Sequence, residues 1–281
     1  MHVAVVWFRH SLRVHDNPVL SWAYESEDID GILPMYIFDE EIHERSTASM
    51  GEHRLRFRFD CVEDLHRNLK NQFDLDLHIF SGDCLDVFQS ISEQLQPFEV
   101  TLLEEYSTNP QDRKQSELIE RKLVNSNQNW SAKSFASCQT ILDVEAVVNA
   151  SGYKPPKSMN DMVRLFNKEF GDFDHVVFKT NDPNPSAKGR KQSLSVNSEY
   201  QVTLDQIRRM LCAPGYFAGG ENEAIARLEK KVISQRDYVR RFSKPKSVST
   251  NTQGNPMEPS TTGLSPYISN GCLSIRRLWN A

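Results

Sequence analysis

The sequence has few cysteines, no long apolar run and none of the common nucleotide-binding fingerprints. Its five cysteines are scattered singly without a CxxC pair, which argues against a disulfide framework and against structural zinc. We therefore expect reduced thiols and no metal site. No apolar stretch approaches the roughly 20 residues of a membrane-spanning helix, and the early run VAVVWF is too short and wrongly flanked for a signal peptide. These absences predict an intracellular protein without a membrane partner.

Neither a GxGxxG after the first apolar run nor a GxxxxGK[ST] occurs, so dinucleotide binding by the first half of the chain has no support. The 281 residues are 38% hydrophobic, enough for one large domain or two smaller ones with their own cores. The net charge of -5 conceals an asymmetry, because residues 186–246 carry 13 Lys and Arg against 6 Asp and Glu. This basic stretch suits a polyanion such as DNA, although solvated helix faces explain it equally well.

The first half alternates short apolar runs with longer amphipathic ones. Residues 2–8, 31–38, 75–80 and 99–106 read as strands buried on both faces, because their apolar residues are contiguous. Residues 54–73 form the clearest helix, with apolar side chains at steps of three and four. The alternation predicts an α/β fold with a doubly wound, parallel, five-stranded sheet. Loops at the carboxyl ends of such strands are the default ligand site.

The loop after the first strand, RHSLRVHDNP, is rich in side chains that bind or cap. Asn17 is expected to cap a helix whose first residue is Pro18. Arg9, Arg13 and Asp16 should gather with Asn17 at the same edge of the sheet. Two interpretations stay open: a functional loop, or helix caps and struts between domains.

The chain divides into three parts. Residues 1–141 form the α/β domain, and residues 142–215 form a long connector punctuated by proline, glycine and charge. Residues 216–281 begin a helical unit whose first helix has an apolar stripe formed by Ile225, Leu228, Val232, Val239 and Phe242. Only the polar loop 245–259 and a closing segment follow to cover that stripe, and the last helix has under two turns, so we expect a truncated chain.

The closing segment, STTGLSPYISNGCLSIR, contains two helix starts within ten residues. Ser265 before Pro266 and Ser274 before Ile275 both read as N-caps, and Gly271 should end the first short helix. Hydroxyl groups surround these starts, from Ser260, Thr261, Thr262, Ser265 and Ser274. Hydroxyls and free backbone N–H groups at helix starts suit a bound anion.

Three stretches, in order and at similar spacing, resemble the cryptochrome and DNA photolyase flavoproteins. They are VVWFRHSLRVHDNP, GGENEAIARLE and PSTTGLSPYISNGCLSIR, and the animal cryptochrome and (6-4) photolyase branch fits best. The segments EHRLRFRFDCVEDLHRNL and GYKPPKS are similar to the family less closely. Two departures stand out: Asn270 occupies a usually aromatic position, and KPPKSMNDM replaces the more usual PPxTYxxF.

The resemblance implies a Rossmann-like photolyase domain, a connector and the start of an all-helical domain that binds FAD. The resemblance also implies that the α/β domain is able to carry an antenna, with methenyltetrahydrofolate and a deazaflavin as the candidates. The family's T-[ST]-x-L-S run contacts the flavin diphosphate, and it matches Thr261, Thr262, Gly263, Leu264 and Ser265. Ser274 and Arg276 are able to assist at the diphosphate site, but an N-cap and a solvent-exposed cation are the favoured interpretations. Trp279 is interpreted as a core or interface residue rather than an electron relay. No catalytic residue is assigned.

The leading hypothesis is the N-terminal part of a cryptochrome, a blue-light photoreceptor or circadian-clock regulator that binds FAD and clock or signalling proteins in the nucleus and cytoplasm. The alternative is a light-driven photolyase of the (6-4) type, a carbon–carbon lyase that flips a pyrimidine lesion out of DNA. A third alternative is a short form that acts only as a protein-interaction module. Residues 261–265 would contact only the diphosphate and leave the flavin ring exposed. We therefore expect this chain alone to retain FAD weakly or not at all.

Overall fold

A computed structural model describes residues 1–39, 51–136, 138–171, 175–184, 191–211, 215, 217–235, 237 and 261–281. Several predictions concern residues outside these ranges: Val239, Phe242, the polar loop 245–259, Ser260, Cys212 and seven of the 13 cations of residues 186–246. No helix among the described residues is long and apolar enough to cross a membrane.

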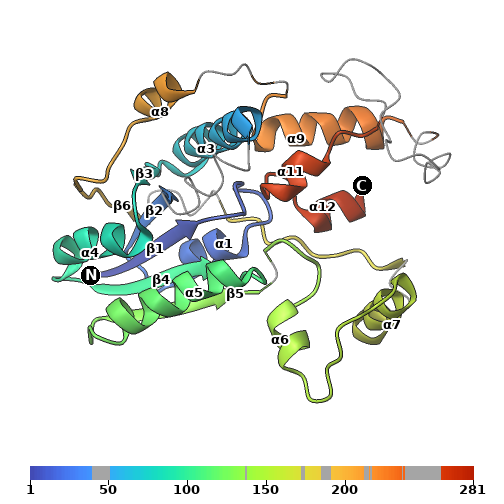
Figure 1. The fold of residues 1–281 in the computed structure, drawn as a ribbon, viewed down its shortest axis with the longest axis horizontal. Helices are drawn as coiled ribbons and strands as arrows, with labels where there is room; N and C mark the ends of the chain where they lie inside the picture. The colour runs from blue at the N-terminus through green and yellow to red at the C-terminus, as the bar shows by residue number, and fades with distance from the viewer. Residues whose placement is uncertain are drawn as a thin grey trace.

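The core of the molecule is a parallel sheet whose five main strands have the order β3-β2-β1-β4-β5 (Figure 1). The strands are β1 (His2–Phe8), β2 (Gly31–Phe38), β3 (His78–Ser81), β4 (Glu99–Glu105) and β5 (Trp130–Phe135). The sheet reverses its direction of growth between β1 and β4, so the fold is doubly wound as the sequence predicts. A two-residue strand, β6 (Gln192–Ser193), adds to β2 from the connector.

Contiguous apolar residues explain the three central strands. Every residue of β2 and six of the seven residues of β1 are buried, because helices cover both faces of the sheet. β5 differs, since four of its six residues are exposed. It forms the outer edge of the sheet, and its sequence WSAKSF therefore lacks the apolar run that indicates a central strand.

Two apolar cores flank the sheet. One is shared by α1 (Pro18–Glu25) and the long α3 (Gly51–Phe73), and the other lies beneath α4 (Cys84–Leu95) and α5 (Pro110–Ile119). The side chain of Asn17 accepts hydrogen bonds from two backbone N–H groups of α1, as expected for an N-cap followed by proline. The helix predicted over 54–73 begins three residues earlier, at Gly51.

The predicted connector contains regular structure: α6 (Val144–Asn149), α7 (Met159–Phe170), β6 and α8 (Leu204–Met210). None of the residues of α6 or α7 is fully buried, and both helices project from the rest of the molecule (Figure 1). The C-terminal part comprises α9 (Glu221–Leu228) with a following π-helical segment (Glu229–Ile233), α11 (Ser265–Ser269) and α12 (Ile275–Asn280).

The C-terminal helices pack onto the α3 side of the sheet. Leu228 of the predicted stripe is buried in the same core as α3, and Val232 packs against that core. Tyr267 of α11 is fully buried there: its ring meets Phe57 of α3 edge-on at 5.1 Å, and its hydroxyl donates to the Ala218 carbonyl. The α/β domain and the C-terminal helices thus share one apolar core.

Candidate functional site

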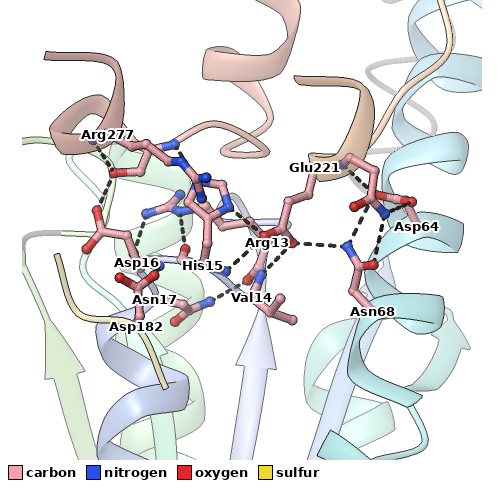
Figure 2. Close-up of polar contacts among 12 residues, drawn as sticks. Arg13, Val14, His15, Asp16, Asn17, Asp64, Asn68, Asp182, Glu221 and Arg277 are labelled. Carbon is pink, nitrogen blue, oxygen red and sulfur yellow. Dashed lines mark hydrogen bonds and ion pairs between the residues drawn. The ribbon is translucent and has the colours of Figure 1, made fainter. Parts of the chain in front are cut away.

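The loop after β1 meets the C-terminal segment through buried polar groups, and we call this region the junction: residues 12–16, Glu221 and residues 270–276 (Figure 2). Its centre is Arg13, whose side chain is 1% exposed. The guanidinium donates to the carbonyls of Cys138 at 2.5 Å and Gly271 at 2.8 Å, and to two carbonyls of its own loop. A buried guanidinium satisfied by carbonyls from distant segments acts as a strut.

Glu221, the first residue of α9, reaches back into the same loop. Its carboxylate accepts hydrogen bonds from the backbone N–H groups of Val14 at 2.8 Å and His15 at 3.0 Å. His15 Nδ1 lies 2.5 Å from Glu221 Oε1, and the other ring nitrogen, Nε2, accepts from the Ser274 backbone N–H at 3.2 Å. Because Nε2 accepts, Nδ1 is the ring nitrogen that donates to the Glu221 carboxylate.

Asp16 holds the start of α12. Arg276 Nε donates to both Asp16 oxygens at 2.9 and 3.0 Å, and the Ser274 hydroxyl donates to the same carboxylate. Ser274 also caps α12 by accepting from the Arg277 N–H, as predicted. The prediction that Arg276 is a solvent-exposed cation is wrong: the residue is 6% exposed, because its charge is paired with a buried aspartate.

Two glycines permit the close approach of these segments. Gly271 follows the end of α11 as predicted and has φ +64°, and a Cβ at this position would lie 1.9 Å from the carbonyl oxygen of His10. Gly220 has φ +111°, and a Cβ there would lie 2.5 Å from Asp64 Cβ. Only glycine combines such backbone angles with so little space. The GG of GGENEAIARLE therefore allows α9 to begin directly against α3.

Burial and hydrogen bonding act in opposite directions on the junction carboxylates. Desolvation raises the pKa of Asp16, but hydrogen bonds from Arg276, Ser274 and the Asn181 N–H outweigh it and hold that pKa below its usual value. Desolvation raises the pKa of Glu221 in the same way, but its hydrogen bonds with the His15 side chain and with the backbone N–H groups of Val14 and His15 outweigh it and hold that pKa below its usual value. Both carboxylates are thus ionised at neutral pH and stabilise the folded chain in that form.

The default ligand position of the fold, where β1 and β4 diverge, is filled by the protein's own side chains. Arg9 Nη1 donates to the Ser116 hydroxyl at 2.9 Å, and its Cζ lies 4.2 Å from the centroid of the Trp7 ring. Glu105 accepts from the Ser11 N–H at 2.9 Å. The cavity at this edge measures about 40 Å³, room for water but not for an aromatic chromophore.

The five residues predicted to contact a diphosphate lie together at the start of α11. Gly263 has φ +67°, and the hydroxyls of Thr261, Thr262 and Ser265 form no hydrogen bond with other described residues. Ser265 was expected to be the N-cap, but the helix begins at Ser265 itself and Leu264 occupies the cap position. Because leucine has no side-chain acceptor, the first turn of α11 has no side-chain cap. Uncapped donors and unpaired hydroxyls fit the chemistry of a phosphate group.

The structure favours struts and caps over a ligand-binding role for the loop after β1. Asn17 caps α1, and Arg13 and Asp16 hold distant segments in place. Sequence reasoning missed Glu221 and His15, which contribute the central contacts. The acidic residue directly after a double glycine was an available signal, because it places a carboxylate at a tightly packed helix start.

The fold and the junction define a doubly wound α/β domain to which the C-terminal helices are fixed. The DNA photolyase family model matches residues 4–185, and the chain therefore belongs to this family. Cryptochrome-1 of Spalax judaei is 27% identical over 280 residues, covering 97% of this chain and 44% of that protein. The (6-4)DNA photolyase of Arabidopsis thaliana is 27% identical over 286 residues, covering 97% of this chain and 48% of that protein. The chain spans less than half the length of either relative.

Solved structures share the fold at lower identity. The Synechocystis cryptochrome matches 99% of this chain and 55% of its own length with a TM-score of 0.67 and 19% identity. The photolyase from Sulfolobus tokodaii, solved with two FAD molecules, matches 99% of this chain and 54% of its own length with a TM-score of 0.62 and 18% identity. At these identities the likeness concerns the fold alone.

Proposed function

We propose that this chain is the N-terminal part of a cryptochrome-type flavoprotein and that residues 261–265 bind the diphosphate of FAD. The observation that carries the proposal is the uncapped start of α11, where three hydroxyls without a hydrogen-bond partner among the described residues surround a glycine with positive φ. Hydrogen bonds from such donors to an anion are charge-assisted, and the local helix dipole adds a smaller favourable contribution. FAD supplies the light-absorbing and electron-transfer chemistry when bound.

The junction has a positioning role in this proposal. It anchors residues 270–276 to the loop after β1, and Tyr267 anchors α11 to α3. Residues 261–265 directly precede these anchored segments in the chain. Preorganised donors bind an anion more tightly than mobile ones, because less conformational entropy is lost on binding.

An antenna chromophore in the α/β domain is not part of the proposal. A cavity of about 40 Å³ at the carboxyl edge of the sheet is far smaller than the several hundred Å³ of a typical cofactor pocket. This cavity alone has no room for methenyltetrahydrofolate or a deazaflavin.

The second candidate function is light-driven DNA repair, favoured by the likeness to the (6-4)DNA photolyase of Arabidopsis thaliana. Repair implies a DNA partner, whereas a photoreceptor or clock regulator implies signalling partners. Under either function, we propose that the protein is found in the nucleus and the cytoplasm. DNA binding through basic residues would weaken steeply with salt, because bound cations are released from the phosphates.

A comparison of FAD with riboflavin tests the diphosphate assignment. Riboflavin carries the same ring system without the diphosphate, so this chain should bind FAD more tightly than riboflavin in a fluorescence-quenching titration. Thr262→Ala combined with Ser265→Ala should reduce FAD affinity by about tenfold, because two charge-assisted hydrogen bonds are lost. Thr108→Ala, a change near α5, is the matched control and should leave it unchanged. Equal binding of FAD and riboflavin, or undiminished FAD binding by the double variant, would contradict the proposal.

A further inference from the structure

The connector helices α6 and α7 enclose an open groove. Its cavity measures about 440 Å³ and is lined entirely by residues 147–169. A second cavity of about 490 Å³ shares Val147, Ala150 and Glu169 with it and extends to Phe178 and Arg276. Both volumes fall within the range of ligand-binding clefts in proteins. We call the first of these cavities, lined by residues 147–169, the α6–α7 groove.

The floor of the groove is apolar and incompletely covered. Val147 of α6 and Leu165 of α7 line it, with Tyr153 and two prolines from the turn between the helices. The apolar stripe of α7, which includes Leu165, Phe166 and Phe170, is only half-buried, and no residue of either helix is fully buried. Short helices in water depend on packing of their apolar face. The stripe is therefore suited to receive apolar side chains from a partner.

The rim of the groove is basic. Four of its lining side chains are cationic, Lys154, Lys157, Arg164 and Lys168, against two carboxylates, Asp161 and Glu169. One carboxylate is already occupied, because Asp161 accepts from the Ser158 hydroxyl and lies 3.4 Å from Arg164. The three lysines have no carboxylate partner among the described residues. The rim charges without an ion pair among the described residues are thus these three lysines and Glu169, so their sum is positive.

We propose that the α6–α7 groove binds an acidic peptide segment of another protein, with apolar side chains on the groove floor and carboxylates beside the lysines. The cationic side chains of the rim favour an acidic partner, because opposite charges attract. The apolar side chains of the floor favour a peptide that presents apolar side chains of its own. A nucleic acid is the weaker candidate, because four cations accompanied by two carboxylates provide little phosphate binding and bases would not use the apolar floor. The inference does not depend on flavin binding.

The probe is a fluorescent helical peptide of about twelve residues in which Glu accompanies Leu and Phe at helical spacing. Fluorescence anisotropy should detect binding to this chain, and a peptide with Lys in place of Glu should not bind. Lys157→Glu combined with Lys168→Glu should weaken binding by about tenfold or more, since two attractions become repulsions. Lys114→Glu, on the exposed face of α5, is the matched control and should leave binding unchanged.

A second variant tests the floor. Leu165→Ser should weaken binding of the peptide by about tenfold. The circular dichroism spectrum of each variant should match that of the parent chain, which shows that a loss of binding does not come from a loss of folding. Failure of the acidic peptide to bind, or equal binding by the parent and the Lys157→Glu, Lys168→Glu variant, would overturn the proposal. Displacement of the peptide by a duplex oligonucleotide, with binding of that duplex abolished by the same lysine changes, would assign the groove to nucleic acid and also overturn it.

Discussion

The junction and the α6–α7 groove differ in whether their charged side chains are buried and paired. In the junction every charged side chain is buried and paired: Arg13 with carbonyls, Asp16 with Arg276, and Glu221 with backbone N–H groups and His15. In the groove the charged side chains are exposed or half-buried, and three lysines have no carboxylate partner in the described part of the chain. Buried pairs hold segments in place and leave no group for a ligand. Exposed charges without a partner hold no segment in place and are available to bind a ligand.

This contrast separates architecture from recognition within one chain. Removing a partner in the junction leaves a desolvated group without compensation, which is costly. Removing an exposed charge in the groove changes stability little, because water replaces the lost contact. Paired substitutions, one in each region, therefore test the contrast directly.

The largest expected effect comes from a glycine pair. Gly271→Ala places a Cβ 1.9 Å from the His10 carbonyl oxygen at φ +64°, so we expect a loss of about 4 kcal/mol or more in the free energy of unfolding. Gly152→Ala, in the turn between α6 and α7, has φ +76° but no atom within 4 Å, and should lose only about 1 kcal/mol. Urea denaturation measures both. Similar losses for the two variants would contradict the close contact at Gly271.

A glutamate pair should give the next largest difference. Glu221→Ala leaves the N–H groups of Val14 and His15 without their acceptor in a buried site, at a cost of about 3 kcal/mol. Glu169→Ala, on the exposed side of α7, should change stability by less than about 0.5 kcal/mol. Chemical unfolding of the two variants provides the comparison, and equal stability would count against the strut role of Glu221.

An arginine pair tests geometry rather than charge. Arg276→Lys keeps the positive charge but loses the guanidinium contact with both oxygens of Asp16, so we expect a loss of about 1 to 2 kcal/mol. Arg164→Lys affects only a surface pair with Asp161 and should be neutral within about 0.5 kcal/mol. Thermal unfolding of both variants is the measurement. A neutral Arg276→Lys would show that the paired geometry at Asp16 is unimportant.

The smallest expected effect concerns pH. The folded-state pKa of Glu221 is lowered, so its contribution to stability is present above the unfolded pKa of about 4.3 and is lost as pH falls through the folded value. Glu221→Gln should therefore flatten the decline of unfolding free energy below about pH 5. Asp161→Asn, where hydrogen bonds from Ser158 and the Lys157 N–H lower the pKa of a half-exposed surface group, should leave the decline much as it is. Urea unfolding at several pH values distinguishes them, and parallel curves for parent and Glu221→Gln would refute the assignment.

Local patterns predicted much of the α/β domain. The central strands follow from contiguous apolar residues, α3 from its helical spacing, and the cap of α1 from asparagine before proline. The position of β5 was not predicted, because an exposed edge strand need not be apolar. The short helices of the connector were also missed, since proline and glycine around them read as an irregular surface segment.

The site was less predictable because its contacts join distant residues. Glu221 and His15 are 206 positions apart, and Arg276 and Asp16 are 260 apart. No local pattern distinguishes a buried, paired Arg276 from a solvent-exposed one. The hydroxyl-rich start of α11 was found in advance, because its chemistry lies within five consecutive residues.

The proposed flavin site depends on residues 261–265 contacting phosphate directly, and phosphorus NMR of FAD titrated with this chain tests that contact. We predict that the two phosphate resonances of FAD shift on addition of the parent chain and of the Lys157→Glu, Lys168→Glu variant. The Thr262→Ala, Ser265→Ala variant should abolish most of the shift. The titration is carried to chain and FAD concentrations high enough to detect weak binding. Under those conditions, phosphate resonances that do not move with the parent chain, or that move equally with the Thr262→Ala, Ser265→Ala variant, would contradict the account.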